Sequence, residues 1–186
     1  MYKRQALDGS YAMRGDAYRA EVDADAFPVN AFMPLLGVGS VTGRVEASGR
    51  GFDFFSPSTA LTCRADVESA EYAGHRYTGI AATAVVADGK ADVSITSADP
   101  SALADVSARG NLAGETLSWE LYADAHRIDF KGLGMGEAET TLSGRFSGAV
   151  DYTMQTGWFG GRLGIDRMQM RDETSEFDIS DVDVTF

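Results

Sequence analysis

Three observations in the sequence predict an all-β fold, an antiparallel meander of roughly ten to thirteen short strands. Apolar and polar residues alternate along most of the chain, most regularly from Leu61 to Glu68. Turn signals follow one another closely, and Asp88-Gly89 is the strongest hairpin signal among them. No helix of about a dozen residues separates the expected strands, which excludes a doubly wound α/β fold.

The expected elements of the first half follow in order. Residues 10–25 predict one or two strands, and Phe27-Pro28 ends them because proline cannot donate to a ladder. Residues 29–36 have helical spacing but contain Pro34, which limits them to a short helix or turn that plugs against the sheet. A β-bulge is expected near Gly79. The remaining strands of this half are expected at 41–49, 61–68, 77–86 and 91–96.

The second half continues the meander after the turn at Asp99-Pro100. Residues 124–136 form an irregular segment, the expected counterpart of the plug at 28–36. Residues 157–164 are rich in glycine, and the strand that they lead into has one break in its alternation. The strands of this half are expected at 106–112, 117–123, 142–152, 163–170 and 177–186.

A repeat is expected because two segments recur at a nearly constant offset. The strand at 41–49 matches the strand at 142–152 at an offset of 101, with Gly43 aligned to Gly144. An earlier pairing aligns Val22 with Leu121 at an offset of 99. We therefore expect residues 1–186 to be one fragment with a first repeat unit at 11–112 and a second, partial unit at 113–186.

The charge balance argues against nucleic acid as a partner. The chain carries 16 Lys and Arg against 28 Asp and Glu, a formal net charge of −12. The basic residues are scattered, whereas a phosphate-binding surface needs a basic stripe. Anionic membrane surfaces are disfavoured as docking sites for the same reason.

The single cysteine and the two ends of the chain give less information about cellular compartment and targeting. Cys63 is the only cysteine, so no intrachain disulfide can form, which fits a reducing compartment and a periplasmic domain equally well. No stretch approaches the ~18 apolar residues of a transmembrane helix, and residues 1–5 lack the apolar run of a signal peptide behind them. Residues 181–186 stop in mid-alternation, so we expect a segment of a longer chain.

No catalytic constellation is expected, and the chain is predicted not to be an enzyme. His75 and His126 have no metal-ligand spacing and are expected to be surface histidines. Cys63 falls on the apolar side of its strand and is expected to be a small, buried hydrophobic residue. A late acidic cluster invites a calcium interpretation, but without the EF-hand spacing solvated strand edges are favoured. This cluster consists of Asp172, Glu173, Glu176, Asp178, Asp181 and Asp183.

Many residues on the apolar side of the expected strands are small, and two interpretations of them stay open. Small residues leave room inside a curved sheet, whereas a tight sandwich fills its interior with larger side chains. Alternatively, bulky facing groups fill that room as an ordinary core, with Phe32, Trp119, Phe146 and Trp158 as candidates. The small positions are Ala65, Ala82, Ala84, Ala91, Gly144 and Gly148.

The order of motifs resembles a known family. An acidic residue and aromatic-proline step, Asp25-Ala26-Phe27-Pro28, leads through Phe32 to Pro34-Leu35-Leu36 and then to the strand Val41-x-Gly43-x-Val45-x-Ala47-x-Gly49. A strand, turn and strand from Tyr72 to Ile80 and Asp88-Gly89 follow. This order is similar to the repeat of the TamB/AsmA-like family. The second copy keeps Leu142-x-Gly144-x-Phe146-x-Gly148 but has His126-Arg127-Ile128 in place of Pro-Leu.

The resemblance, which covers most of residues 15–152, implies an elongated, curved β-meander that forms an open taco-like groove with an apolar interior and short helical plugs. It implies a segment of a periplasmic protein of a Gram-negative bacterium, anchored in the inner membrane, that carries phospholipid acyl chains without a cofactor. An outer-membrane assembly barrel protein is the implied partner of the full-length chain, and the fragment is expected to dimerise through edge strands. The expected groove lining is Val45, Leu61, Ala65, Val67, Ile80, Ala82, Ala84, Val93, Ile95, Leu117, Trp119, Leu121, Leu142, Phe146 and Val150.

Three alternatives remain beside the lipid groove. A scaffold could assemble outer-membrane proteins or autotransporters by β-augmentation, which requires a free strand edge. A transmembrane β-barrel is disfavoured because several expected strands are shorter than ~9–11 residues and no aromatic girdles are evident. A small-molecule hydrolase is disfavoured because the sequence shows no site for one.

Overall fold

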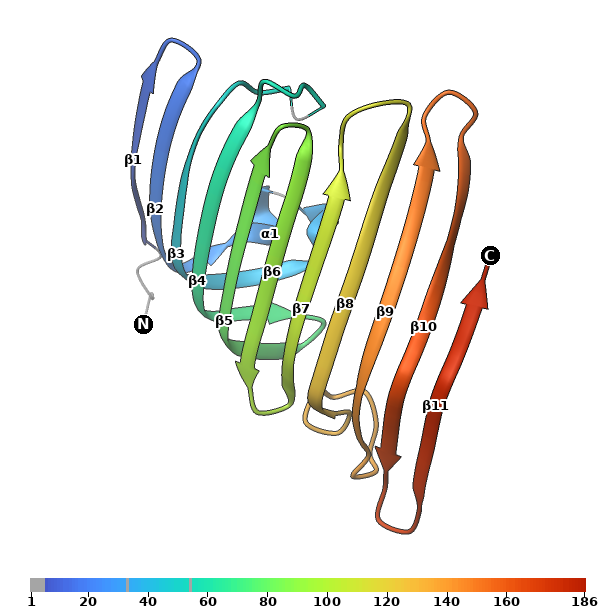
Figure 1. Cartoon of the computed structure of the whole chain (residues 1–186). Coiled ribbons are helices and arrows are strands. Elements are labelled where there is room, and N and C mark those ends of the chain that lie inside the picture. The colour runs from blue at the N-terminus through green and yellow to red at the C-terminus, as the bar shows by residue number, and fades with distance from the viewer. Residues whose placement is uncertain (1–5, 33, 54) are drawn as a thin grey trace.

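The computed structural model describes residues 6–32, 34–53 and 55–186 and shows one antiparallel sheet of eleven strands (Figure 1). The strands lie side by side in chain order, so every connection joins neighbours. The all-β meander is confirmed. The strands are β1 (Ala6–Arg14), β2 (Ala17–Pro28), β3 (Val38–Arg50), β4 (Ala60–Tyr72), β5 (His75–Ala87), β6 (Lys90–Asp99), β7 (Ala102–Asn111), β8 (Thr116–Asp129), β9 (Thr141–Thr153), β10 (Trp158–Arg171) and β11 (Glu176–Thr185).

The strands are longer than the sequence predicts. The shortest, β1, has 9 residues, and the longest, β8 and β10, have 14. The strands therefore reach the ~9–11 residues of a membrane-crossing strand, so their expected shortness is wrong; the sheet is open and does not close into a barrel. Strands extend through turn-like residues because cross-strand pairing compensates for weak local propensity.

One plug and one turn lie where the sequence predicts them. The α1 helix (Val29–Phe32) and the 3-10 helix η1 (Pro34–Leu36) follow β2, which ends at Pro28. The ring of Phe32 stacks on that of Phe27, with 5.1 Å between centroids. The β5–β6 turn has φ angles of 52° at Asp88 and 68° at Gly89, the left-handed pair that a two-residue type I′ turn requires.

Cross-strand pairing aligns apolar residues into rows that cross the whole sheet. In the central row each residue is the direct ladder partner of the next, and paired residues share a face. Other apolar rows lie on both sides of the central row. One of them runs from Tyr11 through Ala20, Ala47 and Cys63 to Val184. The central row is Val22, Val45, Ala65, Ala82, Ile95, Val106, Ala123, Phe146, Ile165 and Val182. We call the surface formed by these rows the apolar face.

The opposite surface, here the polar face, carries most of the charges. Arg44 pairs there with Glu21, with Asp23 at 3.9 Å and with Glu46 at 2.9 Å. Arg109 pairs with Asp92 on the neighbouring strand. The alternation of every strand thus separates apolar from charged side chains across one sheet.

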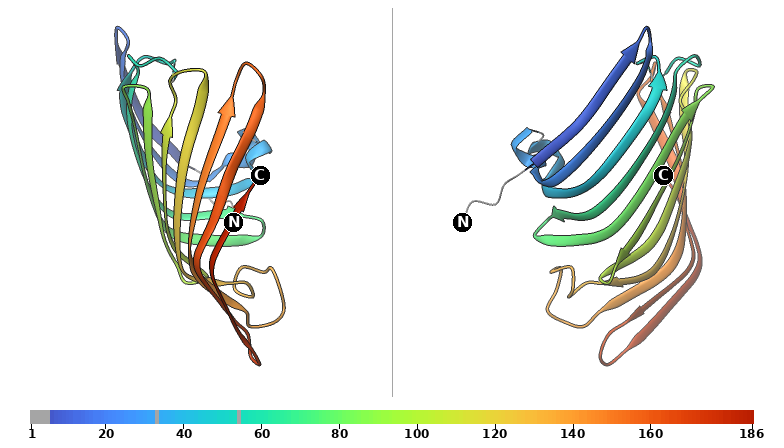
Figure 2. Two further views of the ribbon diagram at one scale, coloured as in Figure 1. Left: turned by 45° about the vertical axis from the view of Figure 1, so that its right-hand side comes forward. Right: turned by 90° about the vertical axis from the view of Figure 1, so that its left-hand side faces the viewer.

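The sheet is curved and open. Figure 2 shows the strands bending toward the side on which α1 lies. Phe27 pairs with Val41, which has the same parity as Gly43 and Val45 of the apolar rows, so the Phe27–Phe32 stack places α1 on that side. The curved, open sheet is therefore confirmed, and an apolar interior of the groove stays a prediction.

The two hairpins of the expected repeat have the same register. In β2–β3, Ala24 faces Gly43 and Phe27 faces Val41 across a bulge; in β8–β9, Ala125 faces Gly144 and Ile128 faces Leu142 across the same irregularity. All four positions are separated by 101 residues. The pairing at an offset of 99 is wrong, because Val22 and Leu121 lie in neighbouring rows. The unit boundaries at 11–112 and 113–186 stay a prediction.

The sheet is a single layer without a closed core. Among the described residues, only Val86, Ala91 and Ala125 are buried hydrophobic side chains. The accessible surface is 12336 Å². A compact protein of this mass would expose roughly 8,600 Å². The small residues of the apolar parity therefore line an uncovered surface, and the interpretation as an ordinary core is wrong.

Candidate functional site

The apolar face is the main candidate site, and it gathers all the predicted lining residues. The ladder register places each of the fifteen on this face, spread over six strands, β3 to β6, β8 and β9. Three of the larger ones remain accessible, with Val45 38% exposed and Ile95 and Leu121 both 39% exposed. The structure brings the set together; contact with lipid stays a prediction.

The prediction missed the apolar residues at the two ends of the face. Their strands show the same alternation, which was the available signal, but the glycines around residue 160 interrupt it. They comprise Tyr11, Met13, Tyr18, Phe159, Leu163, Val184 and Phe186. The rings of Phe159 and Phe186 lie 5.7 Å apart at the β10 end of this face.

Large side chains on the apolar face cover glycines on the same face. A Cβ added at Gly110 would lie 2.7 Å from the ring of Trp119, its ladder partner on β8. A Cβ at Gly49 would likewise lie 2.8 Å from the hydroxyl of Tyr18. The room above glycine is thus filled from the neighbouring strand rather than from a second layer, which leaves a level apolar surface.

Two of the expected filling groups lie elsewhere. Trp158 is the first residue of β10 and lies on the polar face, with its ring over Gly160. It is 55% exposed. Phe32 lies on α1 against Phe27 and is 68% exposed. Neither covers the centre of the apolar face, so their assignment as core residues is wrong.

A buried polar cluster was not predicted; it lies where β5 begins, β6 ends and the chain turns into β7. Asp99 is 2% exposed and accepts hydrogen bonds from the backbone N–H groups of Thr78 at 2.8 Å and Ser101 at 2.9 Å. His75 lies 3.4 Å from the same carboxylate. Burial alone would raise the pKa of Asp99, but these hydrogen bonds outweigh burial and lower it.

This cluster supports the ladder rather than a reaction. Gly79 has a φ of 63° and interrupts the β4–β5 pairing, and β5–β6 pairing begins only at Ile80. The Asp99 side chain replaces the missing backbone acceptor for Thr78. His75 is therefore not a surface residue, since only 16% of its side chain is exposed.

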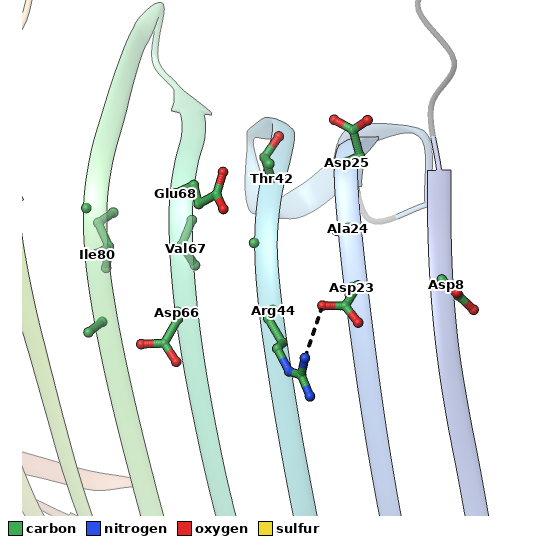
Figure 3. A pocket seen from close by; sticks show the side chains of 13 residues that line it. Asp8, Asp23, Ala24, Asp25, Thr42, Arg44, Asp66, Val67, Glu68 and Ile80 are labelled. Atoms are coloured by element: carbon green, nitrogen blue, oxygen red, sulfur yellow. Dashed lines mark ion pairs between the residues drawn. The ribbon is translucent and has the colours of Figure 1, made fainter.

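The polar face holds an acidic depression of about 650 Å³ (Figure 3). Asp8, Asp23, Asp66 and Glu68 line it, and Arg44 is the basic side chain among its lining residues. Arg44 points toward Asp23, and its pKa is raised, first of all by Glu21. Arg44 pairs with Asp23 and Arg64 with Asp66, and the described lining residues include no Ser, Cys or His.

The other titratable candidates lie apart from one another. Within the part of the chain that the structure describes, no group of three or more His, Cys, Asp or Glu side chains is arranged to hold a metal. His126 lies on the polar face, 2.8 Å from Asp105 and 44% exposed. Cys63 lies on the apolar face and is partly exposed rather than buried.

The described helices are too short, and carry too few apolar residues, to cross a lipid bilayer. Comparisons with family models, curated proteins and solved structures find no match to this chain.

Proposed function

We propose that the apolar face binds the acyl chains of phospholipids, and that the chain is a non-enzymatic segment of a periplasmic envelope protein that carries lipid between inner and outer membranes. The observation that supports this proposal is the uninterrupted apolar surface across eleven strands of a single-layer sheet. A monomeric soluble protein rarely exposes so large an apolar patch unless something covers it. The inner side of the curved sheet offers acyl chains an elongated site.

The physical chemistry of acyl chains suits this surface. Each methylene removed from water contributes about 0.8 kcal/mol. An acyl chain can lie along the rows, over Val93, Ile95 and Phe146, while its head group stays at the solvent-exposed margin. Such a surface has no specific polar pocket, so it would accept chains of different length and allow them to slide.

The test is native mass spectrometry of the protein purified without detergent from a bacterial host. We expect phospholipid to copurify and to be released on denaturation. Phe146→Asp and Ala84→Asp place a charge on the apolar face and should remove the lipid, because a carboxylate within an acyl-chain site is desolvated. Circular dichroism checks that each variant is folded.

The matched controls lie one residue away on the polar face. Ser147→Asp and Thr83→Asp add the same charge to the same strands and should leave the lipid bound. A lipid-free wild-type protein, or equal lipid loss in variants of both faces, would contradict the proposal.

A second candidate function is a scaffold that assembles outer-membrane proteins or autotransporters by strand addition. The observation that favours it is that β1 and β11 are both free edges of the sheet. This function requires a free edge and does not require the apolar face. A lipid-free protein that captures an outer-membrane strand, with capture unchanged by Phe146→Asp, would favour the scaffold.

A further inference from the structure

The free edge at β1 has an unpaired row of backbone groups. β1 pairs with β2 alone, and Arg14 and Ala17 close the hairpin over two residues. A turn of this length closes on a hydrogen-bonded pair, and hydrogen-bonded and non-bonded pairs alternate along the ladder. The N–H and C=O groups of Met13, Tyr11 and Gly9 are therefore directed away from β2, toward the free edge.

The charges on β1 lack partners within the described chain. Asp8 and Arg14 lie on the polar face, near opposite ends of β1. Neither forms an ion pair with another described residue. Asp8 faces Asp23 across the ladder, which is an unfavourable like-charge pair, and Arg14 faces Ala17. Each end of β1 thus presents one unbalanced charge.

We propose that β1 is the interface of a homodimer, in which two copies of this strand pair antiparallel about a two-fold axis at Tyr11. In this register Tyr11 faces Tyr11 of the second copy through its outward backbone groups. Asp8 of each copy then faces Arg14 of the other, so two ion pairs form at once. A register centred on Ser10 would place Asp8 opposite Ala12 and leave all four charges unpaired.

The two-fold symmetry also extends the apolar face from one copy into the other. A two-fold axis normal to the sheet keeps the apolar faces of both copies on one side. The rows that end at Gly9, Tyr11 and Met13 then run on into the second copy. The proposal goes beyond the lipid function, since it depends on the edge alone.

The opposite edge disfavours the same arrangement. Antiparallel pairing that keeps the apolar faces together joins like edge to like edge. At β11 this would bring Asp178 and Asp183 close to the same carboxylates of the second copy, because the polar parity of this strand is acidic. Like charges facing each other across a ladder are destabilising, so β1 is the edge that accepts a second copy.

The test is a charge swap measured by sedimentation equilibrium. One strand pair is a small interface, so we expect a weak dimer with a Kd of roughly 1–100 μM. Asp8→Arg or Arg14→Asp alone creates two like-charge contacts and should weaken the dimer about tenfold or more. The double variant restores both ion pairs with reversed sign and should return the Kd to within about threefold of wild type. Asp178→Asn on β11 is the matched control and should leave the Kd unchanged.

The register has its own test, in a Cys63→Ala background. Tyr11→Cys should form a disulfide-linked dimer on mild oxidation, because the two-fold axis places this residue opposite itself. Met13→Cys should not, since it faces Gly9 of the second copy. A wild-type protein that stays monomeric at millimolar concentration, a double variant that is not rescued, or equal crosslinking at both positions would overturn the proposal.

Discussion

Gly43 in β3 and Gly144 in β9, 101 residues apart, both lie against the backbone of the following strand. A Cβ at Gly43 would be 2.5 Å from the carbonyl oxygen of Asp66, and one at Gly144 would be 2.5 Å from that of Arg167. A bulge in the ladder adjoins each contact and brings the two strands close. The two glycines are thus equivalent positions of the repeated hairpin.

We expect Gly43→Ala and Gly144→Ala to lower the free energy of unfolding by about 1–3 kcal/mol each, because the added methyl group forces the backbones apart. Gly148→Ala, on the same face of β9, is the control: its Cβ would lie 3.8 Å from the nearest atom. Urea denaturation measures all three. Equal effects at residues 144 and 148 would show that the close approach does not matter.

Asp99→Asn should destabilise the sheet at neutral pH by about 1–3 kcal/mol, because a buried carboxylate that accepts several hydrogen bonds is replaced by a weaker acceptor. The folded-state pKa of Asp99 is lowered, so its stabilising effect is present above the unfolded pKa and is lost as the pH falls through the folded value. Denaturation of both proteins between pH 7 and pH 3 measures this. A constant difference across that range would contradict the assignment. Asp92→Asn, on the exposed polar face, should have little effect.

His126 should titrate above its ordinary value of 6.5, because Asp105 accepts a hydrogen bond from its ring and Asp124 adds a second negative charge. Protonated His126 therefore stabilises the fold at low pH, and this contribution is lost as the pH rises through the raised pKa. NMR titration of the ring measures it. Asp105→Asn should lower the midpoint more than Asp124→Asn does; no change in either variant would refute the pairing.

Asp172, in the β10–β11 turn, should titrate at a pKa of about 2 rather than 3.8, because the Thr174 backbone N–H, the Ser175 hydroxyl and the Ser175 N–H all donate to its carboxylate. The turn is thus supported above the unfolded pKa and loses this support as the pH falls through about 2. Carbon-detected NMR of the carboxyl group gives the value. Ser175→Ala should raise it toward 3.8, whereas an unchanged midpoint would mean that the hydroxyl does not donate in solution.

Much of the fold was predictable because its determinants are local. Alternation with a period of two identifies each strand, and Asp88-Gly89 identifies a turn, without knowledge of any distant residue. The glycine-rich stretch at 157–164 was harder, since glycine is a poor strand former. In the structure β10 runs through it from Trp158, because ladders on both sides hold it and the Phe186 ring covers Gly161.

The candidate site also has one part that was predictable from the sequence and one part that was not. That the fifteen predicted lining residues share one face followed from their alternation alone, since alternation assigns each side chain to one of two faces; that they line a lipid groove stays a prediction. The cluster around Asp99 did not, because its donors come from β5 and from the turn before β7, whereas the accepting carboxylate lies at the end of β6. No short-range pattern links these residues, and only the pairing of the three strands brings them within hydrogen-bond distance.

The sequence by itself determined that each strand has an apolar and a polar side, because that property depends only on the order of residues. The tertiary structure decided how the strands align. Register depends on turn lengths, on bulges such as those after Ala24 and Ala125, and on pairing between separate strands. It also decided the side toward which the sheet bends. Eleven independent alternations thereby became one apolar face, because every strand entered the ladder in a register that kept its apolar side on the same face.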